Sequence, residues 1–394
     1  MTEHPQRKVI YLDNAATSWP KPDCVYEAME TFMRKVGASP GRSGHHLANE
    51  AERIRFDARE AIAELLGLSD PMRVVFALNA TTALNMVMQG LLPEGSHVVT
   101  TSMEHNSVMR PLRALEQRGV AVSIVPCQAD GSISVKAIGE HIKPETRLIV
   151  VNHASNVCGT VLPIREIGAL ARQRGVTFLL DAAQTVGCWP INMAADNIDL
   201  LAFSGHKSLL GPTGTGGLAF SDNFDIATLP ATAFGGTGSG SEQETHPEFL
   251  PDKYEIGTPN IAGLAGLDAG VRFVLQRGVE EIQQHERDLA NRLIDGLQSI
   301  AGMHTLGVAG PLSRTAVVSF TCDGRSCSDI AHHLDERFAI MSRPGLQCAP
   351  RAHRTMGTFP DGTVRLSPGF SSTVADIEQT LDAVADLVGA KAVG

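Results

Sequence analysis

Short, mainly apolar runs recur along the first half of the chain, with segments of helical spacing between them. Between residues 70 and 220 these runs are Val74 to Leu78, His97 to Thr101, Val120 to Val125, Leu148 to Val151, Phe178 to Leu180 and Leu200 to Phe203. Apolar runs of this length are typical of strands buried on both faces. Because strands that alternate with helices build βαβ units, the pattern predicts an α/β fold with a mostly parallel sheet.

The pattern changes after Pro259, where a long helical pattern extends from about Gly263 to Ile300. The elements expected after it are a strand at Ala316 to Thr321, a helix at Asp329 to Phe338, a strand at Val364 to Ser367, and a last helix carrying Val374, Ile377, Leu381, Val384 and Val388. This mixed α+β pattern marks a second domain, as expected for a chain of 394 residues. We expect a large α/β domain over residues 21–262 and a small α+β domain over residues 263–394.

Composition and charge narrow the classes of partner. The chain carries a net charge of -10 and has no long basic run. Nucleic acids and anionic membranes are bound mainly through clustered lysine and arginine, so neither is expected as a partner. The segment Met1 to Ile10 is polar, and no run of about 18 apolar residues occurs. We therefore expect a cytoplasmic protein that acts on a small molecule or contacts other proteins.

The seven cysteines do not form a recognisable framework. Their number is odd, they are scattered, and no Cys-x-x-Cys pair occurs. Free thiols are therefore expected rather than disulfides. Cys322 and Cys327 lack a second pair or a histidine cluster that would complete a metal site, so no metal is expected. Cys24, Cys127 and Cys188 are expected to be small buried residues.

The strongest chemical signal is a lysine at the end of an apolar run. Ser204-Gly205-His206-Lys207 follows Leu200 to Phe203 and precedes a glycine-rich segment. A lysine on such a turn either is an ordinary surface residue or forms a Schiff base with an aldehyde cofactor. Upstream, Asp181 ends the strand that contains Phe178 to Leu180, at the strand end where ligands bind in open α/β sheets. Alone, Asp181 would be interpreted as a helix N-cap, but the pair fits a pyridoxal phosphate site.

Other polar positions follow neighbouring strands. Ala80 and Thr81 stand between a strand and a helical run, where backbone N–H groups either cradle a phosphate or are capped. His105 follows the strand His97 to Thr101, although a single histidine is more often an ordinary polar residue. Cys348 lies in a turn-like segment beside Arg343 and Arg351, whose charges favour a thiolate. These residues are candidates for a phosphate site and a nucleophile.

Several ordered motifs together resemble the cysteine desulfurases of the class V aminotransferase family, and most of all the branch of SUF-type desulfurases and selenocysteine lyases. The motifs are Tyr11 to Thr17, Met103 to Asn106, Ala154 to Thr160 around Asn156, Asp181 to Gln184, Ser204 to Lys207, Glu255 to Asn260, and Arg343 to Ala349. The similarity extends from about residue 10 to 388. It implies the fold type I architecture of pyridoxal-phosphate transferases. That architecture has a mostly parallel, seven-stranded type of sheet in the large domain, a smaller α+β C-terminal domain, and residues 1–20 packed against the small domain.

The resemblance also implies roles at the cofactor. Lys207 would bind pyridoxal 5'-phosphate and move the substrate proton, Asp181 would pair with the ring nitrogen, and His105 would stack on the ring. The remaining cofactor-binding positions would be Gln184 and Asn156 near the ring hydroxyl, and Ala80, Thr81, Ser204, His206 and Thr258 at the phosphate. In the family, the position of Thr258 reaches the phosphate of the partner subunit. This implies a homodimer with shared active sites.

At the substrate, the resemblance implies that Arg365 grips the carboxylate beside Asn156, a task suited to the guanidinium fork. Cys348 would take the sulfur of L-cysteine as a persulfide, leaving L-alanine, and would pass it to a sulfur-acceptor protein, as in iron–sulfur cluster assembly. The alternatives are a selenocysteine lyase and an aminotransferase or racemase of a small amino acid. A cofactor-sensing regulator is less favoured because this acidic chain has no spare DNA-binding segment.

Three departures from the family pattern indicate a side branch. Gln347 stands where many relatives have histidine before the cysteine, which removes a proton-handling neighbour. Three residues, Ser208 to Leu210, separate Lys207 from Gly211, and the segment Phe234 to Ser241 is unusually rich in glycine. By default the glycine-rich segment is a flexible loop; the alternative is a loop that orders over the site.

Overall fold

A central sheet of seven strands organises the larger part of the molecule. The computed structural model describes residues 8–41, 44–240, 242–310 and 313–389. The strands, in spatial order, are β2 (Val74–Ala77), β8 (Gly216–Phe220), β7 (Leu200–Ser204), β6 (Thr177–Asp181), β5 (Thr146–Asn152), β3 (His97–Thr101) and β4 (Ala121–Val125). Strand β8 is antiparallel to both of its neighbours, and the other pairs are parallel. The expected α/β class with a mostly parallel sheet is confirmed.

Both faces of this sheet are covered by helices, which explains the continuous apolar runs. In β6, Phe178 and Leu180 join one core cluster and Leu179 joins the other, as the alternation of side chains along a strand requires. One face packs against α2 (His46–Leu66), α5 (Val135–Glu140), α6 (Ile164–Arg174) and α7 (Ile261–Arg277), with α1 (Asp23–Thr31) beside α7. The other face packs against α3 (Ala80–Leu91) and α4 (Asn106–Glu116).

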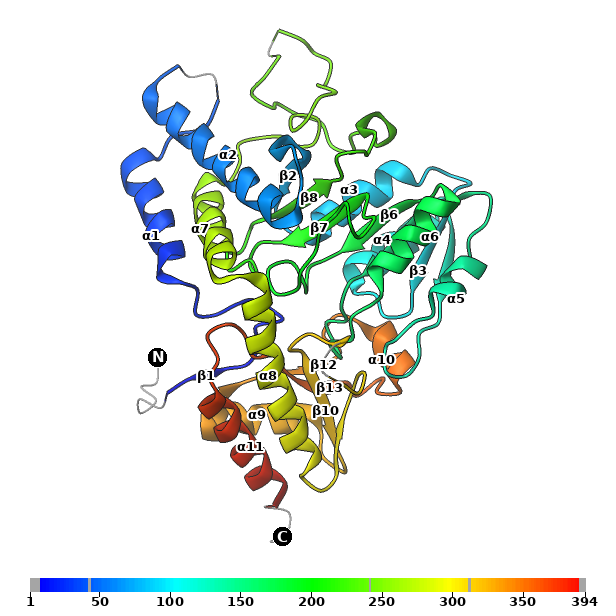
Figure 1. The fold of residues 1–394 in the computed structure, drawn as a ribbon, viewed down its shortest axis with the longest axis vertical. Helices are drawn as coiled ribbons and strands as arrows, with labels where there is room; N and C mark the ends of the chain where they lie inside the picture. Colours follow the sequence, from blue (N-terminus) through cyan, green and yellow to red (C-terminus); the bar gives the residue numbers. More distant parts are fainter. Residues whose placement is uncertain (1–7, 42–43, 241, 311–312, 390–394) are drawn as a thin grey trace.

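A second, antiparallel sheet lies below the first in Figure 1. Its strands, in spatial order, are β12 (Arg343–Gly345), β13 (Thr363–Leu366), β10 (Val318–Cys322) and β9 (Met303–Thr305). Its own apolar cluster includes residues of α8 (Val279–Gln298), α9 (Cys327–Phe338) and α11 (Val374–Gly389). The N-terminal strand β1 (Ile10–Tyr11) pairs in parallel with β11 (Ile340–Met341) on this side of the molecule. The remaining short elements are η1 (Phe32–Val36), η2 (Pro71–Arg73), η3 (Ile226–Thr228) and α10 (Pro350–Met356).

The predicted apolar strands are observed, although the sequence did not predict β8, and two further expectations are wrong. The expected single helix from Gly263 to Ile300 is two helices, because Gly278 adopts a φ of 87° between α7 and α8. Cys24 is exposed, so its predicted burial is wrong, whereas Cys188 is buried and Cys127 is intermediate. Residues 1–7 and 390–394, which the predicted N-terminal segment and small domain include, lie outside the described residues, as does Ser241 of the glycine-rich segment. Among the described residues, no helix is both long and apolar enough to cross a membrane.

Candidate functional site

The carboxyl ends of four neighbouring strands meet at one edge of the large sheet. Asp181 ends β6, Ser204 ends β7, His105 follows β3 and Asn156 follows β5. Together with the Lys207 turn they border one cavity, whose lining is Ala80, Thr81, His105, Ser107, Asn152, Ala154, Asn156, Asp181, Ala183, Gln184, Ser204 and Lys207. The structure thus brings together most of the positions that sequence reasoning singled out, because parallel strands end at the same edge.

Lys207 stands on a loop that closes on itself just beyond β7. Gly205 N–H donates to Thr215 O at 2.9 Å, and Gly211 N–H donates to Gly205 O at 2.8 Å. Only glycine fits at 205, because a Cβ there would lie 2.2 Å from Thr215 Oγ1. The pKa of Lys207 is lowered to about 8, mainly by burial; Asp181 opposes this shift, and Arg365 and Arg343 contribute to it. An amine with this pKa is partly neutral near pH 8, as a nucleophile or base must be.

Asp181 faces the same cavity from the end of β6. Its Oδ1 accepts a hydrogen bond from Ala183 N–H at 3.0 Å. The side chain is 6% exposed, and burial raises its pKa, while Lys207 acts in the opposite direction. A carboxylate in a buried cavity is stabilised by a cationic or N–H partner. The residues therefore fit a ligand that carries a protonated ring nitrogen.

His105 is held in one orientation by the helix that it caps. Its Nδ1 accepts a hydrogen bond from Ser107 N–H at 3.0 Å at the start of α4. The pKa of His105 is lowered to about 4, mainly by burial and to a smaller extent by the charge of Lys207. The imidazole is therefore neutral near pH 7 and carries its proton on Nε2, because Nδ1 is an acceptor.

The helix α3 begins at the cavity, because its first two residues, Ala80 and Thr81, line it. The N-cap side chain of Asn79 accepts from Thr82 N–H at 3.0 Å, and the first N–H groups of a helix have no partner within it. His206 Nδ1 is buried without a partner, and burial lowers the pKa of His206 to about 4. The unpartnered N–H groups at the start of α3 suit a phosphate. His206 is not among the residues that line this cavity, although it adjoins Lys207, which lines it.

Gln184 lines this cavity, whereas Thr258 does not. Gln184 lines it and donates from Nε2 to Ala15 O at 3.1 Å. Thr258 is exposed and lines a separate cavity beside Leu78 and Asn85. The structure of one chain therefore does not bring Thr258 to Lys207.

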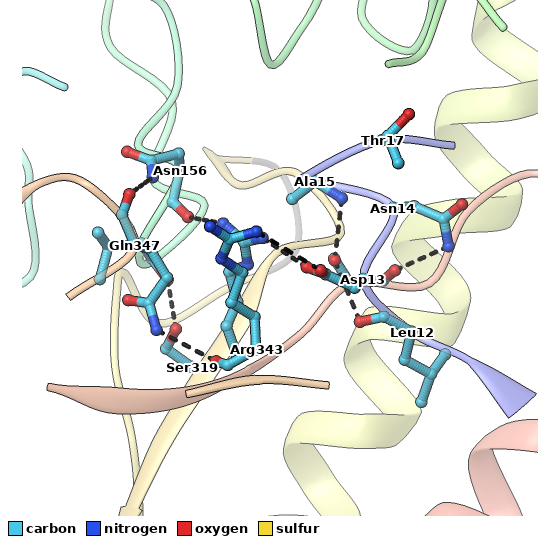
Figure 2. Close-up of polar contacts among 12 residues, drawn as sticks. Leu12, Asp13, Asn14, Ala15, Thr17, Asn156, Ser319, Arg343 and Gln347 are labelled. Carbon is cyan, nitrogen blue, oxygen red and sulfur yellow. Dashed lines mark hydrogen bonds and ion pairs between the residues drawn. The ribbon is translucent and has the colours of Figure 1, made fainter. Parts of the chain in front are cut away.

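Arg365 approaches from β13 of the second sheet and is 2% exposed. Its Nη2 lies 2.7 Å from Asp13 Oδ1, its Nη1 donates to Asn156 O at 3.0 Å, and its Nε is buried without a partner. Arg343 lies directly opposite on β12, and Figure 2 shows it facing Asp13. Sequence reasoning quoted Asp13 and Arg343 within motifs and gave neither a role at the substrate. Their pairing depends on strand register, which the sequence pattern does not reveal.

Cys348 lies on a turn with unusual backbone angles. Gln347 and Cys348 have φ values of 41° and 60°, in the left-handed region that favours glycine. The thiol residue is exposed, its carbonyl accepts from Asn106 N–H at 2.9 Å, and it is close enough to Lys207 to influence its pKa. An exposed thiol beside the cavity is placed to reach a bound substrate.

The side chain of Gln347 points away from this chemistry and is 5% exposed. Its Nε2 donates to Arg343 O at 3.2 Å and to Thr363 O at 3.1 Å, and its Oε1 lies 2.9 Å from His353 Nε2. Its carbonyl accepts from Asn156 Nδ2 at 2.7 Å. Gln347 therefore ties the strained turn to β12, β13 and α10, a role that the sequence comparison with histidine did not predict.

Glu104 is a second residue whose role sequence reasoning missed. Its side chain is fully buried beneath the cavity, and Oε1 accepts from Thr101 Oγ1 at 2.6 Å and from Asn152 N–H at 3.2 Å. The pKa of Glu104 is raised to about 8, mainly by burial; the hydrogen bond from Thr101 opposes this shift, and Asp181 contributes to it. Glu104 is therefore mainly neutral near pH 7 and joins the ends of β3 and β5.

Comparisons with known proteins agree on the family. The model of the aminotransferase class-V family matches residues 10–380. A probable cysteine desulfurase of Methanothermobacter thermautotrophicus is 34% identical over 387 residues, covering 97% of this chain and 96% of that protein. Another from Halalkalibacterium halodurans is 35% identical, covering 94% of this chain and 91% of that protein.

Solved structures give the same result. The apo structure of a cysteine desulfurase from Thermococcus onnurineus superposes with a TM-score of 0.91 at 32% identity, covering 97% of this chain and 95% of that one. The cysteine desulfurase CsdA from Escherichia coli superposes with a TM-score of 0.87 at 27% identity, with the same coverage. The predicted resemblance and the fold type I architecture are both confirmed.

Proposed function

Since the chain belongs to the class-V aminotransferase family, we propose that it is a cysteine desulfurase that depends on pyridoxal 5'-phosphate. The observation that carries this proposal is the joint placement of three side chains. Lys207 and Asp181 border one cavity, and the exposed Cys348 lies beside it, since its carbonyl accepts from the N–H of Asn106, the neighbour of the lining residue His105. A lysine and a carboxylate suit the cofactor, and a thiol beside them suits sulfur transfer.

The residues that would hold the cofactor fit its parts. Asp181 would accept from the protonated ring nitrogen, the neutral imidazole of His105 would lie against the ring, and Gln184 and Asn156 would lie near its hydroxyl. The phosphate would bind Ser204, His206 and the N–H groups of Ala80 and Thr81. When bound, pyridoxal phosphate supplies an aldehyde for an amine and a ring that withdraws electrons from the substrate carbon.

At the substrate, Arg365 would hold the carboxylate, because its Nε is buried without a partner. Asn156 would lie beside the substrate, where its Nδ2 keeps one N–H beyond the bond to Gln347 O and its unpartnered Oδ1 can accept from an N–H or O–H group. Lys207, with its lowered pKa, would take the proton from the substrate α-carbon and return a proton. The roles of Arg365 and Asn156 thus use hydrogen-bonding atoms that have no partner among the described residues, and the role of Lys207 uses its lowered pKa.

The thiolate of Cys348 would then attack the sulfur of L-cysteine. A sulfur–sulfur bond forms as the carbon–sulfur bond breaks, and the electron pair left on the substrate carbon takes a proton. The products are L-alanine and a persulfide on Cys348, so atoms balance between one cysteine and one protein thiol. An acceptor thiol, on a sulfur-acceptor protein, would remove the outer sulfur.

We also propose that two chains share their active sites. Thr258 lies on the exposed segment that lines the separate cavity, and Leu78 in the same lining is 64% exposed. Exposed apolar residues around a cavity suit a subunit interface. In a homodimer, Thr258 would reach the phosphate bound by the partner chain.

The test uses the purified protein loaded with pyridoxal phosphate and given L-cysteine. We expect equimolar alanine and sulfide in the presence of a reductant, and one added sulfur atom on the peptide that contains Cys348. Cys348→Ser should lose both products, while Cys24→Ser, which alters another exposed cysteine, should keep them. A fully active Cys348→Ser protein would contradict the sulfur-transfer role, and turnover of selenocysteine alone would favour a selenocysteine lyase.

A further inference from the structure

Residues 10–18 form a strap between the segments that follow β13 of the second sheet and β7 of the large sheet. On one side, Ser367 N–H donates to Leu12 O at 2.7 Å and Asn14 N–H donates to Ser367 O at 3.2 Å. On the other side, Ser18 N–H donates to His206 O at 3.0 Å, next to Lys207. Asp13 stands between Leu12 and Asn14, so backbone hydrogen bonds on both sides fix its position at the end of β13 (Figure 2).

Asp13 faces a pair of arginines that would otherwise repel. Arg343 and Arg365 are direct partners in the antiparallel pair of β12 and β13, an arrangement that is unfavourable for like charges. Asp13 Oδ1 lies 2.7 Å from Arg365 Nη2, and Asp13 Oδ2 lies 3.8 Å from Arg343 Nη1. Each carboxylate oxygen therefore faces one guanidinium. Without it, the buried Arg365 would lose its ion-pair partner, which is strongly unfavourable.

The hydrogen-bond donor of Arg365 that has no partner is suited to a second carboxylate. Its Nη2 contacts Asp13, its Nη1 contacts Asn156 O, and its Nε is buried without a partner. Two guanidiniums and one carboxylate leave one net positive charge. The nearby hydroxyl of Tyr11 stays neutral, since burial and Asp13 raise its pKa. The cluster is therefore complementary to one further negative charge.

We propose that Asp13 is a positioning residue for the carboxylate of the substrate, acting by holding Arg365 in the orientation that binds it. The proposal rests on the proposed function in taking an amino acid as the substrate. Asp13 does not touch the substrate in this scheme. It fixes the direction of the guanidinium fork and offsets the repulsion from Arg343.

Removal of Asp13 could either strengthen or weaken carboxylate binding, and the direction of the change distinguishes two mechanisms. If Asp13 merely occupied the arginines in competition with substrate, its removal would raise the local positive charge and tighten carboxylate binding. If Asp13 positions Arg365, its removal frees the fork to move, and carboxylate binding weakens. The two cases are distinguished by the direction of the change in affinity.

The experiment measures binding by titration calorimetry on the protein loaded with pyridoxal phosphate. The probes are L-alanine, propionate, which keeps only the carboxylate, and ethylamine, which keeps only the amine. For Asp13→Ala we expect the Kd of L-alanine and propionate to rise about tenfold or more, as for loss of a charged hydrogen bond, and that of ethylamine to change less than about twofold. Asp13→Asn keeps one acceptor for Arg365 and should show a smaller rise, about threefold.

Lys8→Ala is the matched control, because Lys8 pairs with Asp376 at 2.7 Å just before the strap and does not touch the arginines. It should leave the affinities for all three probes unchanged. Tighter carboxylate binding, unchanged binding, or an equal loss for ethylamine in either Asp13 variant would overturn the proposal. Because propionate binding requires no turnover, a protein that converts no cysteine yet shows this dependence would refute the proposed function and leave the role of Asp13 intact.

Discussion

The two sides of the candidate site are built in different ways. The strand-end side comprises Asp181, Ser204, His105 and the Lys207 turn, which end or follow strands of one mostly parallel sheet. The turn side comprises Asp13, Arg343, Arg365, Gln347 and Cys348, and Asp13 and Arg365 are 352 positions apart in sequence. The side chains of the strand-end side are positioned by the packed core of the sheet. Those of the turn side are positioned mainly by individual hydrogen bonds and ion pairs.

This difference has an energetic consequence. The strands behind the first side are almost entirely buried, as in β7, where all five residues are buried, so their positions are fixed by apolar packing. The turn of Gln347 and Cys348 keeps two left-handed residues in place by hydrogen bonds to side chains and carbonyls. Replacing one side chain on the strand-end side should remove chemistry but keep the structure. Replacing a buried side chain that supports the turn, such as Gln347, should disturb structure and chemistry together.

The largest expected effect comes from Lys207→Ala on the strand-end side. Alanine formation should fall by about a thousandfold or more, because the amine that binds the cofactor and moves the proton is lost. The unfolding midpoint of the protein without cofactor should change little, because the loop is held by backbone contacts of Gly205 and Gly211. The measurements are the rate of alanine formation and the thermal unfolding curve.

Lys21 provides a matched control for this prediction. Burial lowers its pKa to about 8, as for Lys207, and its Nζ lies 3.3 Å from His206 O. Borohydride reduction of the loaded protein should attach the cofactor to Lys207 and leave Lys21 unlabelled, because Lys21 does not line the cavity with Asp181. Labelling of Lys21 would reverse the assignment.

On the turn side, Gln347→Ala should affect both stability and thiol chemistry. The change removes the hydrogen bonds to Arg343, Thr363 and His353 and leaves buried groups unsatisfied, at a cost of about 3 kcal/mol. The rate at which iodoacetamide alkylates Cys348 should change by about threefold or more, since the turn loses its support. Urea unfolding and mass spectrometry of the Cys348 peptide measure the two effects.

Gln117→Ala, at an exposed glutamine after α4, is the control for this change. It should leave both the urea midpoint and the alkylation rate as they are in the unaltered protein. An unchanged urea midpoint for Gln347→Ala would mean that backbone contacts alone hold the turn. In that case the contrast between the two sides would disappear.

The same contrast explains which parts of the molecule were predictable from sequence. The strand β3 was predicted with its observed bounds, and the ends of β6 and β7 indicated Asp181 and Ser204, because apolar runs determine buried strands and strand ends determine the site edge. The antiparallel β8 was missed because Gly216 and Gly217 weaken its apolar pattern. Asp13 received no role because its contact with Arg365 depends on pairing between the two ends of the chain. The sequence comparison interpreted Gln347 only as the loss of a proton-handling histidine. Its observed role, holding the turn of Cys348, depends on hydrogen bonds to residues that folding brings close.

The last expected effect, a change in the pH dependence of stability, concerns Glu104, which is buried beneath the strand-end side. Its pKa is raised from 4.5 to about 8 by burial, so the unfolded chain releases this proton at a lower pH than the folded protein does. The stability contributed by the neutral carboxyl is therefore fully present below pH 4.5 and is lost as the pH rises toward 8. Over that window Glu104 lowers the free energy of unfolding by at most about 1.4 kcal/mol per pH unit.

Glu104→Gln removes this titration and keeps an acceptor for Thr101 Oγ1 and Asn152 N–H. Urea unfolding at pH 5, 6, 7 and 8 should show a flatter pH dependence for the variant than for the unaltered protein, with the two curves diverging toward pH 8. Glu116→Gln, at a partly exposed glutamate paired with Arg113, should leave the slope unchanged. Parallel curves for Glu104→Gln would show that Glu104 already ionises in the folded protein. The strand-end side would then depend on a buried charge and its polar contacts, as the turn side does, rather than on apolar packing alone.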